Sequence, residues 1–127
     1  MSAAQNTLIE EKKLKLELRL AQLEKNEKCR DDFLTFVKTV WPDFIAGRHH
    51  KIIAEKLERV AKGELNRLII NMAPRHTKSE FASFLFPAWF MGRDPKKKII
   101  QATHTTELAV NFGRKTNNKI EADKFKK

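Results

Sequence analysis

The residues with the clearest chemical potential form one short loop, Met72-Ala73-Pro74-Arg75-His76-Thr77-Lys78-Ser79. Its last two residues match the Lys-Ser/Thr ending of a loop that binds nucleotide phosphates. In such a loop, backbone N–H groups and the positive end of a helix converge on one point, where phosphate oxygens bind. We expect Lys78 to reach the β- and γ-phosphates and Ser79 to ligate Mg²⁺. The predicted chemistry is therefore the binding of a nucleoside triphosphate.

The loop departs from the usual pattern G-x-x-x-x-G-K-S/T at both of its glycines. Met72 and Thr77 occupy these two positions. Glycine serves there because it adopts positive φ and lets the backbone approach a phosphate closely. Thr77 therefore predicts either a different turn geometry or a narrower cradle. The motif alone leaves open that this is an ordinary basic loop.

The segments around the loop predict a strand before it and a helix after it. The run 68–70 is apolar, β-branched and without helical period, and the run 99–102 is similar. Between them we expect an apolar helix from about residue 79 to 91, kinked by Pro87, which lacks an N–H. Together they predict an α/β fold that contains one parallel β-α-β unit.

The first 30 residues predict a charged N-terminal helix. Residues 7–28 are rich in Leu, Glu and Lys, contain no Gly or Pro, and begin with a capping box from Thr7 to Glu10. The leucine spacing is too irregular for a coiled coil. We expect a helix that projects from the domain or docks on a partner.

Two further helices are predicted before the first strand. Asp31 or Asp32 is placed to cap a helix that ends near residue 40, and residues 49–62 show helical spacing up to Gly63. The resulting organisation is a charged helix over residues 1–30, a partial domain over residues 31–115, and a basic polar tail over residues 116–127.

Composition narrows the classes of function. The chain has 127 residues, one cysteine and a formal net charge of +10, which predicts a single domain without disulfides and with an anionic partner. Residues 114–127 carry six basic and two acidic residues, so nucleic acid is the leading partner, although a solvated end is the alternative. No apolar stretch is long enough to span a membrane, so we expect neither insertion nor export.

A wider window resembles a known family. From Phe33 to Arg114, the strings FLTFVKTVWPDFIAG, RLIINMAPRHTKSEFASFLFPAWFMGRDP and IIQATHTTELAVNFGRK resemble the N-terminal ATPase region of large terminase subunits of tailed phages. That family carries a variant P-loop of the Pro-Pro-Arg-His-Gly-Lys-Ser kind. Five residues of this chain match that loop and two differ, the matches being Pro74, Arg75, His76, Lys78 and Ser79, and the differences Ala73 and Thr77.

The resemblance implies a fold, a reaction and partners. The fold is the start of a P-loop NTPase of the RecA-like (ASCE) type. The reaction is hydrolysis of ATP with Mg²⁺ to drive double-stranded DNA into a viral prohead, alongside a separate nuclease domain. The partners are DNA, the portal of the prohead and the small terminase subunit, and the location is the host cytoplasm.

The resemblance also assigns roles around the phosphates. Residues 74–79 are expected to bind the nucleotide, and Arg75 is the candidate γ-phosphate sensor, with an ordinary surface arginine as the alternative. His76 is expected to pack or to donate to a phosphate. The segment from Arg48 to Lys51 lies where related ATPases contact adenine.

The resemblance fades after Lys115, and in the family the carboxylates that hold Mg²⁺ and activate water lie far downstream. We therefore expect an N-terminal fragment with an incomplete sheet. Such a fragment would bind ATP weakly, or only when a downstream fragment completes it. A homo-oligomer is the other association that we consider. The alternative is a non-catalytic DNA-associated or partner-binding remnant of a terminase.

Overall fold

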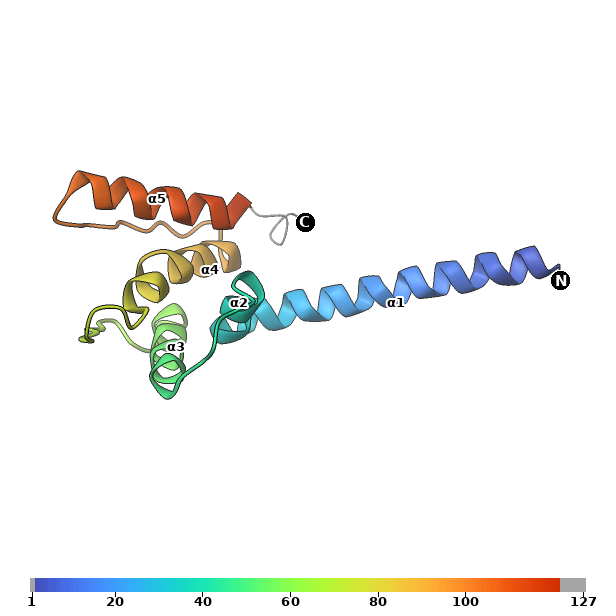
Figure 1. Cartoon of the computed structure of the whole chain (residues 1–127), viewed down its shortest axis with the longest axis horizontal. Helices are drawn as coiled ribbons and strands as arrows, with labels where there is room; N and C mark the ends of the chain where they lie inside the picture. Colours follow the sequence, from blue (N-terminus) through green and yellow to red (C-terminus); the bar gives the residue numbers. More distant parts are fainter. Residues whose placement is uncertain (1, 122–127) are drawn as a thin grey trace.

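The computed structural model describes residues 2–121, apart from the side chain of residue 119, and these residues form a helical protein. The elements in chain order are α1 (Ala3–Asp31), α2 (Phe33–Val40), α3 (Arg48–Ala61), the π-helix η1 (Glu80–Leu85), α4 (Phe86–Arg93) and α5 (Thr106–Glu121). In Figure 1, η1 and α4 lie between α5 on one side and α2 and α3 on the other, while α1 projects away.

The predicted α/β fold with a parallel β-α-β unit is wrong for the described part of the chain. Residues 2–121 contain helices and loops, and no strand. Two strands separated by a helix need further strands to complete a sheet, and an isolated pair is marginal in water. Neither predicted run has a neighbouring strand here, so the incomplete RecA-like sheet does not form.

The first predicted strand nevertheless keeps an alternating pattern of burial. Leu68, Ile70 and Met72 pack against the core, whereas Ile69 between them is 84% exposed. Alternation of this kind is typical of extended backbone. Ile100, in the second predicted strand, is 95% exposed. The two runs are therefore not the buried strands that the sequence predicted.

The helices predicted before the loop are confirmed. Asp32 caps α2 by accepting a 3.1 Å hydrogen bond from the Thr35 N–H. Beyond the end of α3, Gly63 has φ of +79°, the left-handed conformation that favours glycine. The predicted capping box at Thr7 is wrong, because α1 begins four residues earlier and the Thr7 hydroxyl donates to the Ala3 carbonyl over 2.6 Å.

The helix predicted after the loop is present and longer than expected. Helical backbone runs from Lys78 to Arg93, with the π-helical part directly before Pro87. Pro87 has no N–H for the Ser83 carbonyl four residues earlier. The side chain of Gln101 donates to that carbonyl instead. This bond fastens the loop between α4 and α5 to the helix.

Aromatic side chains form the centre of the core. The Phe33 ring is fully buried and lies 5.6 Å from Phe81, 6.0 Å from Phe86 and 5.3 Å from Trp89, measured between centroids. Such ring pairs contribute about 0.5–1.5 kcal/mol each beyond burial. The Trp89 Nε1–H donates to the Cys29 carbonyl over 2.8 Å, which ties α4 to the end of α1. Helices α1, α2 and α4 therefore meet in this cluster.

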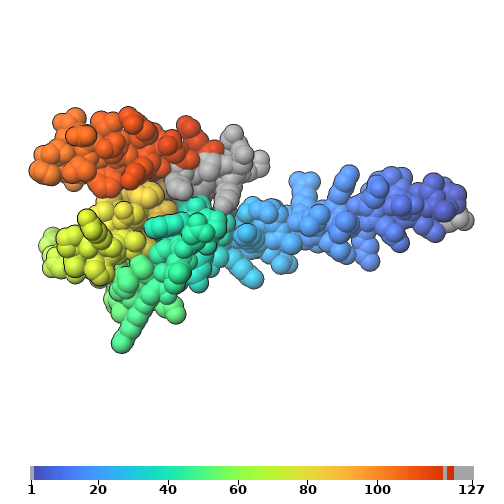
Figure 2. Space-filling view, viewed as in Figure 1, coloured from blue at the N-terminus to red at the C-terminus, as the bar shows by residue number. Residues whose placement is uncertain are grey.

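Helix α1 contributes no buried residue to this core. Its large apolar side chains are about half exposed along the whole helix, and Figure 2 shows it as an arm beside the body of the protein. These side chains are Leu8, Ile9, Leu14, Leu16, Leu18, Leu20 and Leu23. The expectation of a helix that projects from the domain is met.

Two half-buried carboxyl groups join α2 to α3. Glu58 accepts a 2.9 Å hydrogen bond from the Phe33 N–H at the start of α2. Burial and the neighbouring Asp32 raise the pKa of Glu58. Burial opposes ionisation of Asp32 as well, but hydrogen bonds from Thr35, Glu58 and the backbone outweigh it and lower the pKa of Asp32. As pH falls, Glu58 therefore takes up a proton before Asp32 does.

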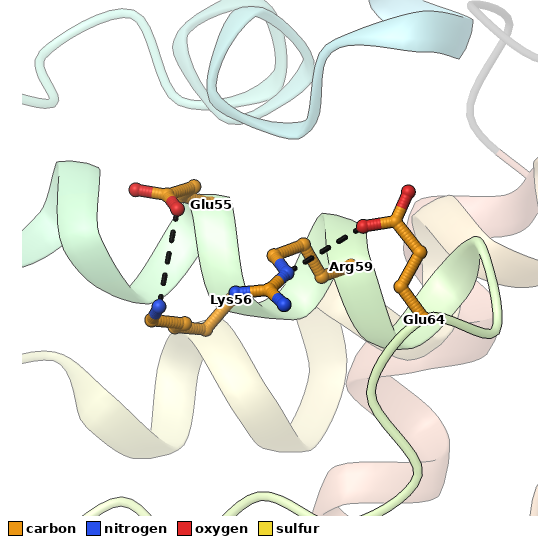
Figure 3. A network of polar contacts seen from close by, with 4 residues as sticks. All are labelled: Glu55, Lys56, Arg59 and Glu64. Carbon is orange, nitrogen blue, oxygen red and sulfur yellow. Dashed lines mark ion pairs between the residues drawn. The ribbon is translucent and has the colours of Figure 1, made fainter.

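The other charged pairs of α3 lie at its surface. Figure 3 shows Lys56 beside Glu55 at 3.9 Å, and Arg59 beside Glu64 at 3.5 Å. Exposed pairs contribute about 0–1 kcal/mol because water and salt screen them. The polar connection that positions α3 is thus the carboxyl pair and not these ion pairs.

We predict that Glu58→Gln raises the melting temperature at pH 7. Glutamine keeps an acceptor for Phe33 and a donor for Asp32 but does not ionise. Because folding raises the pKa of Glu58, its contribution to stability is complete below its ordinary value of 4.5 and is lost as pH rises through the raised value. The gain from Gln should therefore shrink on acidification towards pH 4. Exposed Glu55→Gln is the matched control, and a lower melting temperature for Glu58→Gln at pH 7 would contradict the assignment.

Candidate functional site

The backbone of the loop before η1 has an unusual geometry. Arg75 has φ of 66° and Thr77 has φ of 59°, and these two are the non-glycine residues with positive φ in the described chain. The left-handed conformation costs a residue with a Cβ about 1–2 kcal/mol. Thr77 stands where the phosphate-binding pattern has glycine. It therefore adopts the conformation for which glycine is normally used, and not the different turn geometry that was one of the two predicted alternatives.

Alternation of left-handed and ordinary residues is the geometry of an anion-binding nest, in which successive N–H groups face one concavity. Here Arg75 and Thr77 alternate with His76 and Lys78, whose φ values are not positive. The helix follows at once, and its N–H of Phe81 donates to the Thr77 carbonyl over 3.0 Å. The positive end of the helix thus lies next to these alternating residues.

Lys78 closes the loop on itself. Its Nζ donates a 2.9 Å hydrogen bond to the Met72 carbonyl, so the side chain spans from the end of the loop to its beginning. Ser79 is half-buried in the first helical turn. Both residues thus lie where the loop enters the helix, and their roles toward phosphates and Mg²⁺ stay predictions.

The remaining predicted residues lie on the exposed side of the loop. Pro74, Arg75 and His76 are exposed, and His76 Nδ1 lies 3.0 Å from the Pro74 carbonyl, which accepts its hydrogen. Within residues 2–121, Arg75 forms no ion pair. The alternative of a surface arginine paired with an acidic neighbour finds no such neighbour in that range.

His50 of α3 reaches the loop from the other side. Its Nδ1 accepts a 2.9 Å hydrogen bond from the Gly47 N–H, so the ring hydrogen is on Nε2. Nε2 donates to Thr77 Oγ1 at 2.5 Å, and that hydroxyl donates to the His76 carbonyl at 2.6 Å. One side chain thus joins the start of α3 to the left-handed residue of the loop.

The environment of His50 keeps it neutral. Burial lowers its pKa, and the nearby His49 and His76 lower it further. The ring stacks on Phe81 at 5.2 Å and meets Phe44 edge-on at 4.8 Å. A neutral ring is required here, because Nδ1 must keep its lone pair for the Gly47 N–H.

Sequence reasoning did not single out His50. The resemblance placed the segment from Arg48 to Lys51 near adenine, whereas the structure brings its third residue to the phosphate loop. One local signal was present: His50 is at the third position after Gly47, the N-cap of α3, where a side-chain acceptor bonds back to the cap N–H. The contact with Thr77 has no local signal, since 27 residues separate the two.

Metal binding by protein side chains alone is not indicated. No group of three His, Cys, Asp or Glu in the described residues is arranged to hold a metal ion. His49, His50 and His76 lie near one another, but both nitrogens of His50 are engaged. The binding of Mg²⁺ through Ser79 together with nucleotide phosphates stays a prediction.

Comparison of this chain with protein-family models, with curated proteins and with solved structures finds no match. The resemblance to large terminase subunits stays a prediction. None of the helices between residues 2 and 121 is both long and apolar enough to cross a membrane.

We predict that Arg75→Gly is more stable than Arg75→Ala by about 1 kcal/mol, because only alanine is strained at positive φ. At the exposed helical position Glu55 the order should reverse, with Glu55→Gly about 1 kcal/mol less stable than Glu55→Ala. Chemical denaturation of the four variants measures both differences. The same sign at the two positions would show that Arg75 is not left-handed in solution.

Proposed function

We propose that this chain supplies the ATP-phosphate-binding loop of a viral DNA-packaging ATPase of the terminase large-subunit type. The observation that carries the proposal is the left-handed Thr77 directly before Lys78 and Ser79 at the start of a helix. A glycine-like backbone followed by Lys-Ser is what a phosphate cradle requires. The proposal rests on this loop and helix and needs no sheet within the described residues.

Each loop residue has a role in the proposal. Backbone N–H groups between residues 74 and 79 hold phosphate oxygens, and Lys78 exchanges the Met72 carbonyl for the β- and γ-phosphates. Ser79 ligates Mg²⁺, which neutralises charge on the phosphates when it is bound. Arg75, which is exposed, is the proposed contact to the γ-phosphate. The carboxylate that activates water is not assigned to this chain.

The partners in the proposal follow from charge and from the resemblance. The net charge of +10 suits the phosphate backbone of double-stranded DNA, and Lys96, Lys97 and Lys98 are exposed before α5. The portal, the small terminase subunit and a location in the host cytoplasm are predictions from the resemblance alone.

We predict that Lys78→Ala weakens ATP binding about tenfold or more, because a charge-assisted hydrogen bond contributes about 1.5–3 kcal/mol. Equilibrium titration with ATP and Mg²⁺ measures the affinity. Lys97→Ala is the matched control, since it removes an exposed lysine outside the loop and should leave the affinity unchanged. Equal affinities for wild type and Lys78→Ala would sink the proposal in favour of a non-catalytic remnant.

We predict that replacing Lys96, Lys97 and Lys98 with glutamine reduces the salt dependence of DNA binding. Each lost phosphate contact lowers the slope of log K against log salt by about 0.9 for duplex DNA. Fluorescence anisotropy of a labelled duplex over a salt series measures the slope. The same change at Lys12, Lys13 and Lys15 of the projecting α1 is the control, and equal slopes for the two triple variants would contradict a contact near α5.

A further inference from the structure

A threonine at the glycine position of a phosphate loop needs a specific support. Threonine is β-branched, and branched side chains are genuine outliers at positive φ. Thr77 nevertheless has φ of 59°. Such a conformation persists only where its surroundings enforce it. The support must come from contacts of the Thr77 side chain, because that side chain is what opposes the conformation.

Those contacts form one directed chain of hydrogen bonds. The Gly47 N–H donates to His50 Nδ1, His50 Nε2–H donates to Thr77 Oγ1, and the Thr77 hydroxyl donates onward to the His76 carbonyl. The backbone N–H at one end fixes the tautomer, and the tautomer fixes every donor that follows. The Thr77 hydroxyl both accepts and donates, so its rotamer is determined.

The His50 ring, which donates to Thr77, is held in place by its neighbours. His50 is 7% exposed and is held between Phe44 and Phe81. Gly47 permits the approach of the histidines, since a Cβ there would lie 3.0 Å from His49 Cε1. Phe81 belongs to the helix that follows the loop, so His50 contacts the loop and the helix start together.

We infer that His50 is a positioning residue of the phosphate site, whose hydrogen bond to Thr77 holds the loop in the glycine-like backbone that ATP phosphates require. This inference rests on the proposed function. His50 does not touch the nucleotide and acts only through Thr77. The hydrogen bond from His50 thus lets Thr77 keep the left-handed backbone conformation that glycine adopts without support.

Protonation of His50 at acidic pH removes the hydrogen bonds that hold Thr77. Protonation places a hydrogen on Nδ1 that faces the Gly47 N–H, so two donors meet and the chain of bonds breaks. The titratable groups that face His50 are His49 of α3 and His76 of the loop, while Phe44 and Phe81 carry no charge. Because burial and both histidines lower the pKa of His50, the bonds persist at neutral pH and are lost only as pH falls through this lowered pKa.

A double-mutant cycle tests the inference. His50→Phe keeps a ring between Phe44 and Phe81 and removes both hydrogen bonds, whereas His50→Gln keeps a donor and an acceptor. In the natural Thr77 background, His50→Phe should weaken ATP binding about tenfold, and His50→Gln should recover most of the loss. In the Thr77→Gly background, His50→Phe should change the affinity less than about twofold. Equal losses in both backgrounds would overturn the inference.

Two further measurements keep the test decisive. Thr77→Val removes only the hydroxyl and should reproduce the loss, which covers the case in which His50→Phe does not fold. Acidification through the lowered pKa of His50 should weaken ATP binding by wild type more than by Thr77→Gly, and equal pH profiles would count against His50.

A readout without nucleotide separates this inference from the proposed function. The three-bond HN–Hα coupling of Thr77 reports its φ, and it should change from the left-handed value in His50→Phe. An unchanged coupling would overturn the role of His50. Absence of Lys78-dependent ATP binding would instead overturn the proposed function, while the coupling still decides whether His50 holds Thr77.

Discussion

Contact between Phe33 and Phe81 is the constraint on which the rest of the structure depends. Phe33 opens α2 and is fully buried, and Phe81 is in the first turn after the loop of residues 72–79. The same Phe81 ring also stacks on His50 and meets Phe44 at 5.4 Å. The helix start, and with it the position of Lys78 and Ser79, is therefore set by aromatic packing against α2 and α3. Within residues 2–121 there is no sheet to position the loop, so this aromatic packing fixes its place.

The helices were accessible from the sequence because their signals are local. Asp32, Gly63 and the apolar spacing of residues 49–62 act within a few residues of the helices that they define. The predicted strands failed for the opposite reason. Leu68 and Ile70 face the core as an extended run should, but a strand exists only through hydrogen bonds to a neighbour. The residues of the run do not indicate whether a neighbouring strand is present.

The candidate site likewise contains residues that the sequence indicated and contacts that it did not indicate. The roles of Lys78 and Ser79 were predicted from their types and from a loop that precedes a helix, and the structure confirms only that a helix follows the loop. The conformation of Thr77 was not predictable, because local preference for threonine opposes positive φ. What stabilises it comes from His50, which is 27 residues away in the chain. A pattern search that requires glycine would therefore reject a backbone that has the glycine conformation.

On heating, the long helix α1 is expected to unfold differently from the core. Its 29 residues extend about 44 Å at 1.5 Å per residue and bury no side chain, so its hydrogen bonds break by fraying and not with the core. Both tryptophans, Trp41 and Trp89, pack in or against the core. On heating, tryptophan fluorescence will follow a cooperative transition, while the circular dichroism of helices will decline gradually from lower temperature. A disagreement between these two signals is therefore a property of this architecture and not a folding intermediate.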